Sequence, residues 1–164
     1  MLFGRAHEEI SHLRSKGVAV EVVPGVTAAL GAAASLGVSL TRRGGARSVV
    51  FATPRVGESE PASQWARAVV RADTAALYMA SHEAAAVRDA LLAAGMPGRT
   101  PAVVAAAVSL ADEQRFSGTL AELPRLAERV AGAPALLLLG EVLAEAQAAL
   151  AGEARTARAA SQSR

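Results

Sequence analysis

The sequence predicts an α/β fold in which helices cover a largely parallel sheet. Short β-branched and aliphatic runs alternate with stretches of about 10–14 residues whose apolar positions recur at helical spacing, a pattern typical of this class. The chain has 164 residues and 52% of them are hydrophobic, which is enough for a substantial core and too many for a disordered chain. Cysteine is absent, so neither a disulfide framework nor a thiolate metal site is expected, and the composition fits a reducing cytoplasm.

The first part of the chain predicts a helix, a strand, a second helix and a loop. Gly17 is placed to end the first helix, Pro24-Gly25 closes the strand with a turn, and Thr27 is a suitable N-cap for the second helix. The expected bounds are 5–16 for the first helix, 18–23 for the strand, 27–37 for the second helix and 40–47 for the loop.

The rest of the chain continues the alternation. Pro61 suits the first turn of one helix, Gly95 ends another, and a third must tolerate Pro124 in its first turn. Strands are expected at 48–53, 74–79, 102–108, 115–119 and 135–139. Helices are expected at 61–71, 82–94 and 120–131, followed by a tail from about 143 that begins as a helix and frays toward Arg164.

Charge and motif patterns exclude several functional classes. The 17 basic and 15 acidic residues are interspersed, and Lys16 is the only lysine, so nucleic acid is not an expected partner. The planar arginine fork does suit an acidic small-molecule ligand. His7 and His12 do not share a helical face, so no zinc site is expected, and the Glu8-Glu9 pair fits a solvated helix face. Glycine-rich phosphate motifs and the nucleophile elbow of hydrolases are also absent.

The residues that directly follow the strands are the candidate site. In a parallel α/β sheet the ligand binds beyond the carboxyl ends of the strands. The residues at these positions are Pro24-Gly25-Val26-Thr27-Ala28, Tyr78-Met79-Ala80, Val108-Ser109 and Gly140-Glu141. The first of them leads into a helix N-terminus, where free N–H groups can hold an anion or a polar ligand edge. A plain capped turn there, and a gap-filling role for Met79 in the core, are the structural alternatives.

Several of these segments, taken in order, resemble the tetrapyrrole methylase family. The most specific is Val22-Val23-Pro24-Gly25-Val26-Thr27-Ala28, preceded by Phe3-Gly4-Arg5 with Glu8-Glu9. Later segments keep the order and spacing of the family: Leu77-Tyr78-Met79, Thr100-Pro101-Ala102, Gly118-Thr119-Leu120 and Gly140-Glu141-Val142. The resemblance covers residues 2 to about 143, and within the family it is nearest to the uroporphyrinogen-III C-methyltransferases.

The resemblance implies two α/β domains, the N-terminal one incomplete, with S-adenosylmethionine bound between them. Residues 1–40 would be a remnant of the N-terminal domain, 41–143 the C-terminal domain and 144–164 a helical or disordered tail. An interrupted sheet of this kind would expose an unpaired strand and apolar surface. Arg5 would face the tetrapyrrole, no metal is implied, and the acid and base residues would lie upstream of this chain. The residues that would line the cofactor pocket are Leu2, Thr27, Ala28, Met79 and Val108.

The function implied by the resemblance is S-adenosylmethionine-dependent C-methylation of uroporphyrinogen III, in siroheme or cobalamin biosynthesis. The implied enzyme is a cytoplasmic homodimer with neither a nucleic-acid nor a membrane partner. Two alternatives remain at this stage. The chain could be a non-catalytic remnant of the fold or a dimerisation module, or it could be another member of the family, such as a precorrin methylase or diphthine synthase.

Overall fold

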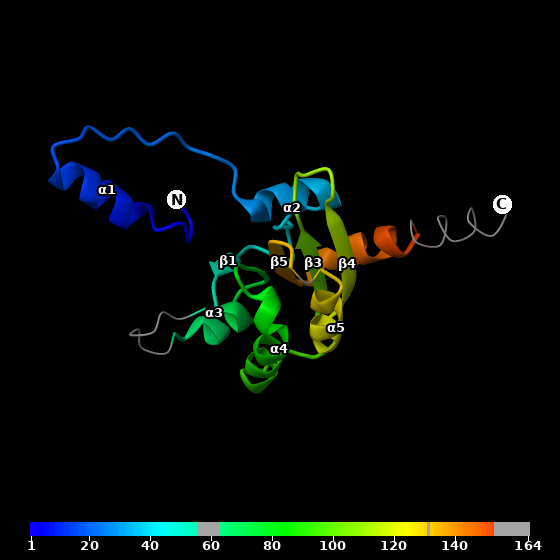
Figure 1. The fold of residues 1–164 in the computed structure, drawn as a ribbon. Helices are drawn as coiled ribbons and strands as arrows, with labels where there is room; N and C mark the ends of the chain where they lie inside the picture. Colours follow the sequence, from blue (N-terminus) through cyan, green and yellow to red (C-terminus); the bar gives the residue numbers. More distant parts are fainter. Residues whose placement is uncertain (56–62, 131, 153–164) are drawn as a thin grey trace.

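The fold is a five-stranded sheet between two helical layers, seen in a computed structural model that describes residues 1–55, 63–130 and 132–152 (Figure 1). The strands are β1 (Val49–Ala52), β2 (Thr74–Leu77), β3 (Pro101–Ala106), β4 (Gln114–Thr119) and β5 (Ala135–Gly140). The α-helices are α1 (Ala6–Ser15), α2 (Ala28–Leu36), α3 (Trp65–Arg71), α4 (Ala84–Ala93) and α5 (Leu123–Glu128), and 144–152 is also helical. The predicted α/β class is therefore confirmed.

The sheet is mixed, so the prediction of a largely parallel sheet was wrong. The strand order is β1-β2-β5-β3-β4, and only the β1–β2 pair is parallel. The reason is that β5 runs antiparallel between β2 and β3, while β4 returns beside β3 as the second strand of a hairpin. Because β1, β2 and β3 share one direction, their carboxyl ends still meet at one edge of the sheet. Gly140 pairs with Thr74 at the start of β2. Gly140-Glu141 therefore lies at the edge of the sheet opposite to the carboxyl ends of β1, β2 and β3, and it is not part of the candidate site.

Two apolar clusters hold the three layers together. On one face, Leu77, Val104 and Leu137 pack with residues of α3, α4 and α5. On the other face, Val103 and Leu138 pack with Ala29 and Ala32 of α2 and with the segment Glu141–Leu143. Alternate residues of β3 and β5 point to opposite faces, so both strands are buried on both sides. The small side chains of α2 allow that helix to lie close to the sheet.

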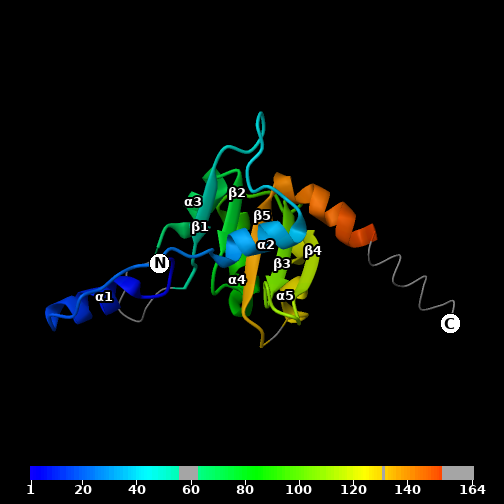
Figure 2. The same ribbon diagram turned by 90° about the horizontal axis from the view of Figure 1, so that it is seen from above.

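The first 26 residues form an arm that projects from the sheet, as both views show (Figures 1 and 2). α1 has no buried residue. The segment at 18–26 that follows it is extended and belongs to no sheet, so the strand predicted at 18–23 was wrong. The β-branched residues do lie in extended chain, but a strand also needs a neighbouring strand, and none lies beside this segment in the described part of the chain. Val23 and Val26 are consequently 80% and 81% exposed.

Most other element predictions hold, with differences at the ends. The third helix begins at Trp65 rather than at Pro61, which lies outside the described residues, as does the part of the tail expected to fray, 161–164. A 3-10 turn at Ser81–Glu83 precedes α4, and another at Leu120–Glu122 precedes α5, which ends at Glu128 rather than near 131. Within the described ranges, no helix is both long and apolar enough to cross a bilayer.

Candidate functional site

A cavity of about 460 Å³ lies at the edge of the sheet where β1, β2 and β3 end. Its lining comes from segments far apart in the sequence: Ala28 opens α2, Tyr78 and Met79 follow β2, Val108 follows β3, and 133–136 lead into β5. Small-molecule sites in proteins commonly measure about 300–1,000 Å³ and combine apolar walls with a few polar groups. The residues with polar side chains among those that line this cavity are Arg55, Tyr78, Ser81 and His82.

The backbone at the cavity wall takes conformations that L-residues rarely adopt. Met79 and Ala107, which line the cavity, have φ of 54° and 50°, and Ser109, next to the lining residue Val108, has φ of 68°, all in the left-handed region. Each follows β2 or β3 closely, so the chain turns sharply as it leaves the sheet. Left-handed non-glycine residues cost of order 1–3 kcal/mol each and tend to gather at ligand sites.

Tyr78 fixes the N-terminus of α2 against the end of β2. Its hydroxyl lies 2.6 Å from the Thr27 hydroxyl and accepts a hydrogen bond from the Ala29 amide at 3.1 Å. Its ring also contacts Phe3 of the arm, with ring centroids 5.1 Å apart. Phe3 near the start of the arm and Thr27 directly after it therefore meet at one side chain. The sequence placed Tyr78 after a strand but assigned it no role, because its partners are about 50 residues away along the chain.

A second set of contacts fixes the other end of α2 to the loop that connects β3 and β4. Glu113 accepts hydrogen bonds from the Ser35 hydroxyl and, at 2.7 Å, from the Ser109 amide. Arg115 donates to the Ser35 carbonyl oxygen at 2.6 Å. The bond from Ser35, more than that from Ser109, holds the pKa of Glu113 below its ordinary value. This network holds the cavity wall at Val108 beside α2.

The structure brings together three of the six predicted site residues as cavity lining. Ala28, Met79 and Val108 all line the cavity, and Thr27 is next to it, bonded to Tyr78. Leu2 and Arg5 lie outside the cavity lining. Leu2 is 46% exposed, and the Arg5 guanidinium forms an exposed ion pair with Glu8 at 2.5 Å, on the first turn of α1.

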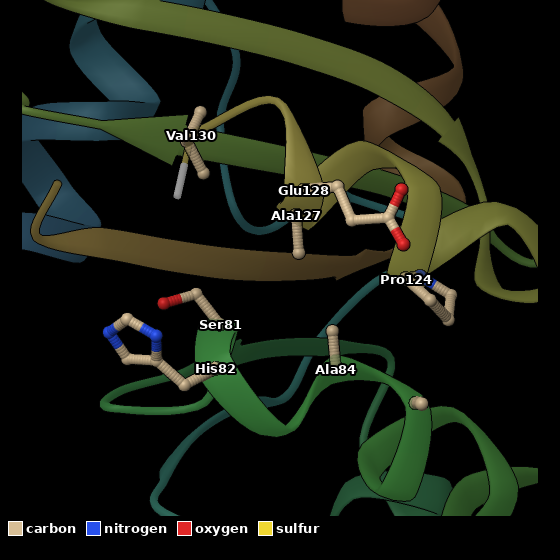
Figure 3. Close-up of a pocket in the computed structure, with 8 residues that line it drawn as sticks. Ser81, His82, Ala84, Pro124, Ala127, Glu128 and Val130 are labelled. Atoms are coloured by element: carbon tan, nitrogen blue, oxygen red, sulfur yellow. The ribbon is translucent and has the colours of Figure 1, made fainter. Parts of the chain in front are cut away.

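A smaller cavity of about 240 Å³ adjoins the first (Figure 3). It lies between the start of α4 and helix α5, with Ser81 and His82 on one side and Glu128 on the other. Ser81 and His82 line both cavities. Among the described residues, no group of three or more His, Asp or Glu side chains is arranged to hold a metal ion.

A mixed sheet between two helical layers, with a cavity at the carboxyl ends of three strands, makes this an α/β protein with a candidate small-molecule site. The chain belongs to the tetrapyrrole (corrin/porphyrin) methylase family, whose family model matches residues 1–124. It is 38% identical over 143 residues to a siroheme synthase of Pseudomonas fluorescens, a match that covers 87% of this chain and 31% of that protein. The predicted family is confirmed.

Solved structures give the same result. The native uroporphyrin III C-methyl transferase of Thermus thermophilus is 34% identical with a TM-score of 0.75, covering 87% of this chain and 60% of that one. The same enzyme complexed with S-adenosyl homocysteine is 33% identical with a TM-score of 0.71, covering 87% of this chain and 62% of that one. The chain thus spans less than a third of the siroheme synthase and three fifths of the Thermus enzyme.

Proposed function

We propose that this chain binds S-adenosylmethionine in the larger cavity and contributes to the C-methylation of uroporphyrinogen III, in siroheme or cobalamin biosynthesis. The observation that carries the proposal is the convergence of Ala28, Met79 and Val108, from three separate segments, on one cavity at the sheet edge. These are residues that the family resemblance assigns to the cofactor. The relative of known structure that holds S-adenosyl homocysteine supports the same ligand class.

The cavity has features that suit such a ligand. Its volume of about 460 Å³ is within the range of small-molecule sites, and alanine, valine and leucine side chains form much of its wall. An adenine ring and a thioether chain both favour apolar walls with a few polar groups at the edge. When bound, S-adenosylmethionine supplies an electrophilic methyl group on a sulfonium. This chain contributes placement: Met79, Val108 and Ala28 confine the ligand. Tyr78 bonds to Thr27 and to the Ala29 amide, on either side of Ala28.

We propose the domain bounds, the oligomeric state, the localisation and two further site residues from the resemblance to the tetrapyrrole methylases. Residues 1–40 belong to a first α/β domain, 41–143 to a second and 144–164 to a tail. The whole enzyme is a cytoplasmic homodimer, Leu2 contributes to the cofactor site, and Arg5 faces the tetrapyrrole. No residue of this chain is assigned acid or base chemistry.

A binding experiment tests the cofactor proposal. Calorimetric titration with S-adenosylhomocysteine should show binding to the wild-type chain, and Met79→Ala should raise the Kd about tenfold by removing a cavity wall. Leu92→Ala is the matched control, because Leu92 is a similarly exposed apolar residue, on α4 and outside the cavity lining. Absence of binding at millimolar ligand would reject the proposal. A methylation assay that offers uroporphyrinogen III against later precorrins would then identify the substrate within the family.

A second candidate function, a non-catalytic dimerisation module, is favoured by the arm. Val18, Val22, Val23 and Val26 are exposed there on an extended segment with no strand beside it in the described chain. Exposed apolar residues next to unpaired backbone are typical of association surfaces. A chain that dimerises in sedimentation equilibrium and binds no S-adenosylhomocysteine would support this candidate over the enzyme.

A further inference from the structure

We propose that Arg55 binds a carboxylate group of the ligand in the larger cavity. This inference rests on the proposed function, because it concerns the ligands of that site. Arg55 follows β1 by a few residues and lines the cavity together with Tyr78 and Met79. The family resemblance assigns the acidic substrate to Arg5 and gives Arg55 no role.

The charge of the cavity wall points to an acidic group. Among the described residues that line the cavity, Arg55 is the only one with a permanently charged side chain, and no Asp or Glu is among them. The arginine charge is effectively never lost. The described residues that line the cavity, largely alanine, valine and leucine beside it, include no counter-ion for this cation. A ligand that brings an anion into the cavity would supply one.

Arg55 is the arginine among the residues that line the cavity, and four arginines elsewhere are already paired. Arg5 pairs with Glu8, Arg42 with Glu145, Arg88 with Asp89, and Arg115 with Glu113 and the Ser35 carbonyl. In the described part of the chain, the Arg55 guanidinium has no ion pair, and the bond recorded for this residue is its backbone amide to the Thr53 hydroxyl at 3.2 Å. That bond is made by the backbone, so within the described residues the guanidinium fork has no partner.

The chemistry of the fork selects a carboxylate. A guanidinium presents parallel N–H donors whose spacing matches the two oxygens of a carboxylate, and a bidentate pair adds orientation to charge. Two ligands of the proposed function carry this group. S-adenosylmethionine has the carboxylate of its amino-acid part, and uroporphyrinogen III has carboxylates around its ring. The side chains of Ser81 and His82 lie in the same wall and offer further polar contacts.

Three ligands distinguish these two sources. S-adenosylhomocysteine contains the amino-acid carboxylate, 5′-methylthioadenosine keeps the adenosine and thioether but lacks it, and uroporphyrin III is a stable polycarboxylate. Each is titrated by calorimetry against the wild-type chain, Arg55→Gln, Arg55→Lys and the control Arg67→Gln. Arg67 is an exposed arginine on α3, outside the cavity lining. Thermal unfolding of each variant shows that the fold is intact.

The expected result is selective. A hydrogen bond to a charged group contributes about 1.5–3 kcal/mol, so Arg55→Gln should raise the Kd of one carboxylate ligand by about 10- to 100-fold. Arg55→Lys should restore part of this, since it keeps the charge and loses the fork. 5′-Methylthioadenosine should bind all four proteins within about twofold, and Arg67→Gln should match the wild type. A loss for S-adenosylhomocysteine assigns the carboxylate to the cofactor, and a loss for uroporphyrin III assigns it to the macrocycle.

Three outcomes would overturn the proposal. Unchanged affinity of Arg55→Gln for both carboxylate ligands would reject Arg55 while leaving the proposed function standing. An equal loss for 5′-methylthioadenosine would show that Arg55 shapes the cavity instead of pairing with a carboxylate. Failure of the wild-type chain to bind any of the three ligands would reject the proposed function, and the role of Arg55 with it.

Discussion

The Tyr78 hydroxyl lies 2.6 Å from the Thr27 hydroxyl, which joins the end of β2 to the first turn of α2. The same oxygen accepts the Ala29 amide at 3.1 Å. Thr27 occupies the N-cap position of α2, but its side chain makes no capping hydrogen bond to the helix. Instead of the Thr27 side chain, the Tyr78 hydroxyl accepts the hydrogen bond of the Ala29 amide, which has no partner within the helix. Residue Ala28 of the cavity wall lies between these two contacts.

Tyr78→Phe should weaken the contact between β2 and α2 without removing the ring that packs there. The ring remains to pack on Phe3 and Phe51, while the bonds to Thr27 and Ala29 are lost, so we expect the free energy of unfolding to fall by about 1–2 kcal/mol. Urea denaturation measures the change. Thr27→Val and the double variant complete a mutant cycle, and a coupling energy indistinguishable from zero would show that the two hydroxyls do not interact.

Gly140→Ala should be among the most disruptive single substitutions. Gly140 has φ of 140°, and a methyl group there would lie 2.6 Å from the Asp73 carbonyl oxygen, a backbone atom that cannot move aside cheaply. Overpacking and backbone strain each cost about 1–3 kcal/mol, so a loss of about 3 kcal/mol or more is expected in urea denaturation.

Gly98→Ala is the control for this prediction. A methyl group at Gly98 would meet Leu92 and Ala121 side chains at 3.6 and 3.7 Å, which are ordinary contacts. Equal effects of the two substitutions would contradict the account of Gly140.

The sequence predicted the elements of the fold better than their arrangement. The run at 135–139 reads as a buried strand, but a strand buried on both faces has the same apolar pattern whether its neighbours are parallel or antiparallel. Its direction depends on pairing with β2 and β3, which the pattern does not contain. For this reason Gly140 was expected at the wrong edge. The extended segment at 18–23 was misread in a related way, since its sequence does not record whether a partner strand is present.

The candidate site was predictable where local motifs mark it. Ala28, Met79 and Val108 each follow a strand or open a helix, and they do converge on one cavity. Arg55 was missed, and Tyr78 was named as a candidate without its role at the helix start. The significance of both lies in what surrounds them: a guanidinium at a cavity with no ion pair in the described chain, and a hydroxyl bonded across about 50 residues. No local pattern records either relationship.

Asp73 gives a pH-dependent contribution to stability. The Ser48 hydroxyl, together with the Arg47 and Ser48 amides, holds the pKa of Asp73 below its ordinary value of 3.8. A carboxyl whose pKa is lower in the folded chain stabilises the fold above pH 3.8 and loses this effect as the pH falls through the folded value. Asp73→Asn should therefore lower the free energy of unfolding at pH 7, with a difference from wild type that shrinks below pH 3.8.

Urea denaturation of both proteins between pH 7 and pH 3 measures this change. Asp112→Asn is the control, since Asp112 lies on the exposed loop after β3. A difference that stayed constant over the whole range would show that the Asp73 charge is not involved.

Removal of the arm should leave the sheet and its helices folded. α1 buries no residue, and the arm residues at 18–26 pair with no strand of the described chain. A chain that begins at Thr27 should therefore keep its cooperative thermal transition, with a Tm within about 4 °C of the full chain, a shift that corresponds to about 1 kcal/mol. Because Val18, Val22, Val23 and Val26 are lost with the arm, it should also bind less of a hydrophobic dye.

A longer deletion is the control for the arm. A chain that begins at Gly37 also loses α2, whose Ala29, Ala32 and Ala33 are buried against Val103 and Leu138 of the sheet. Removing that layer uncovers one face of β3 and β5, so we expect loss of the cooperative transition and increased dye binding. If the chain that begins at Thr27 also lost its cooperative thermal transition, the arm would be part of the core. If instead only the longer deletion does so, the folded unit begins at α2 and the apolar arm is free to associate with another polypeptide.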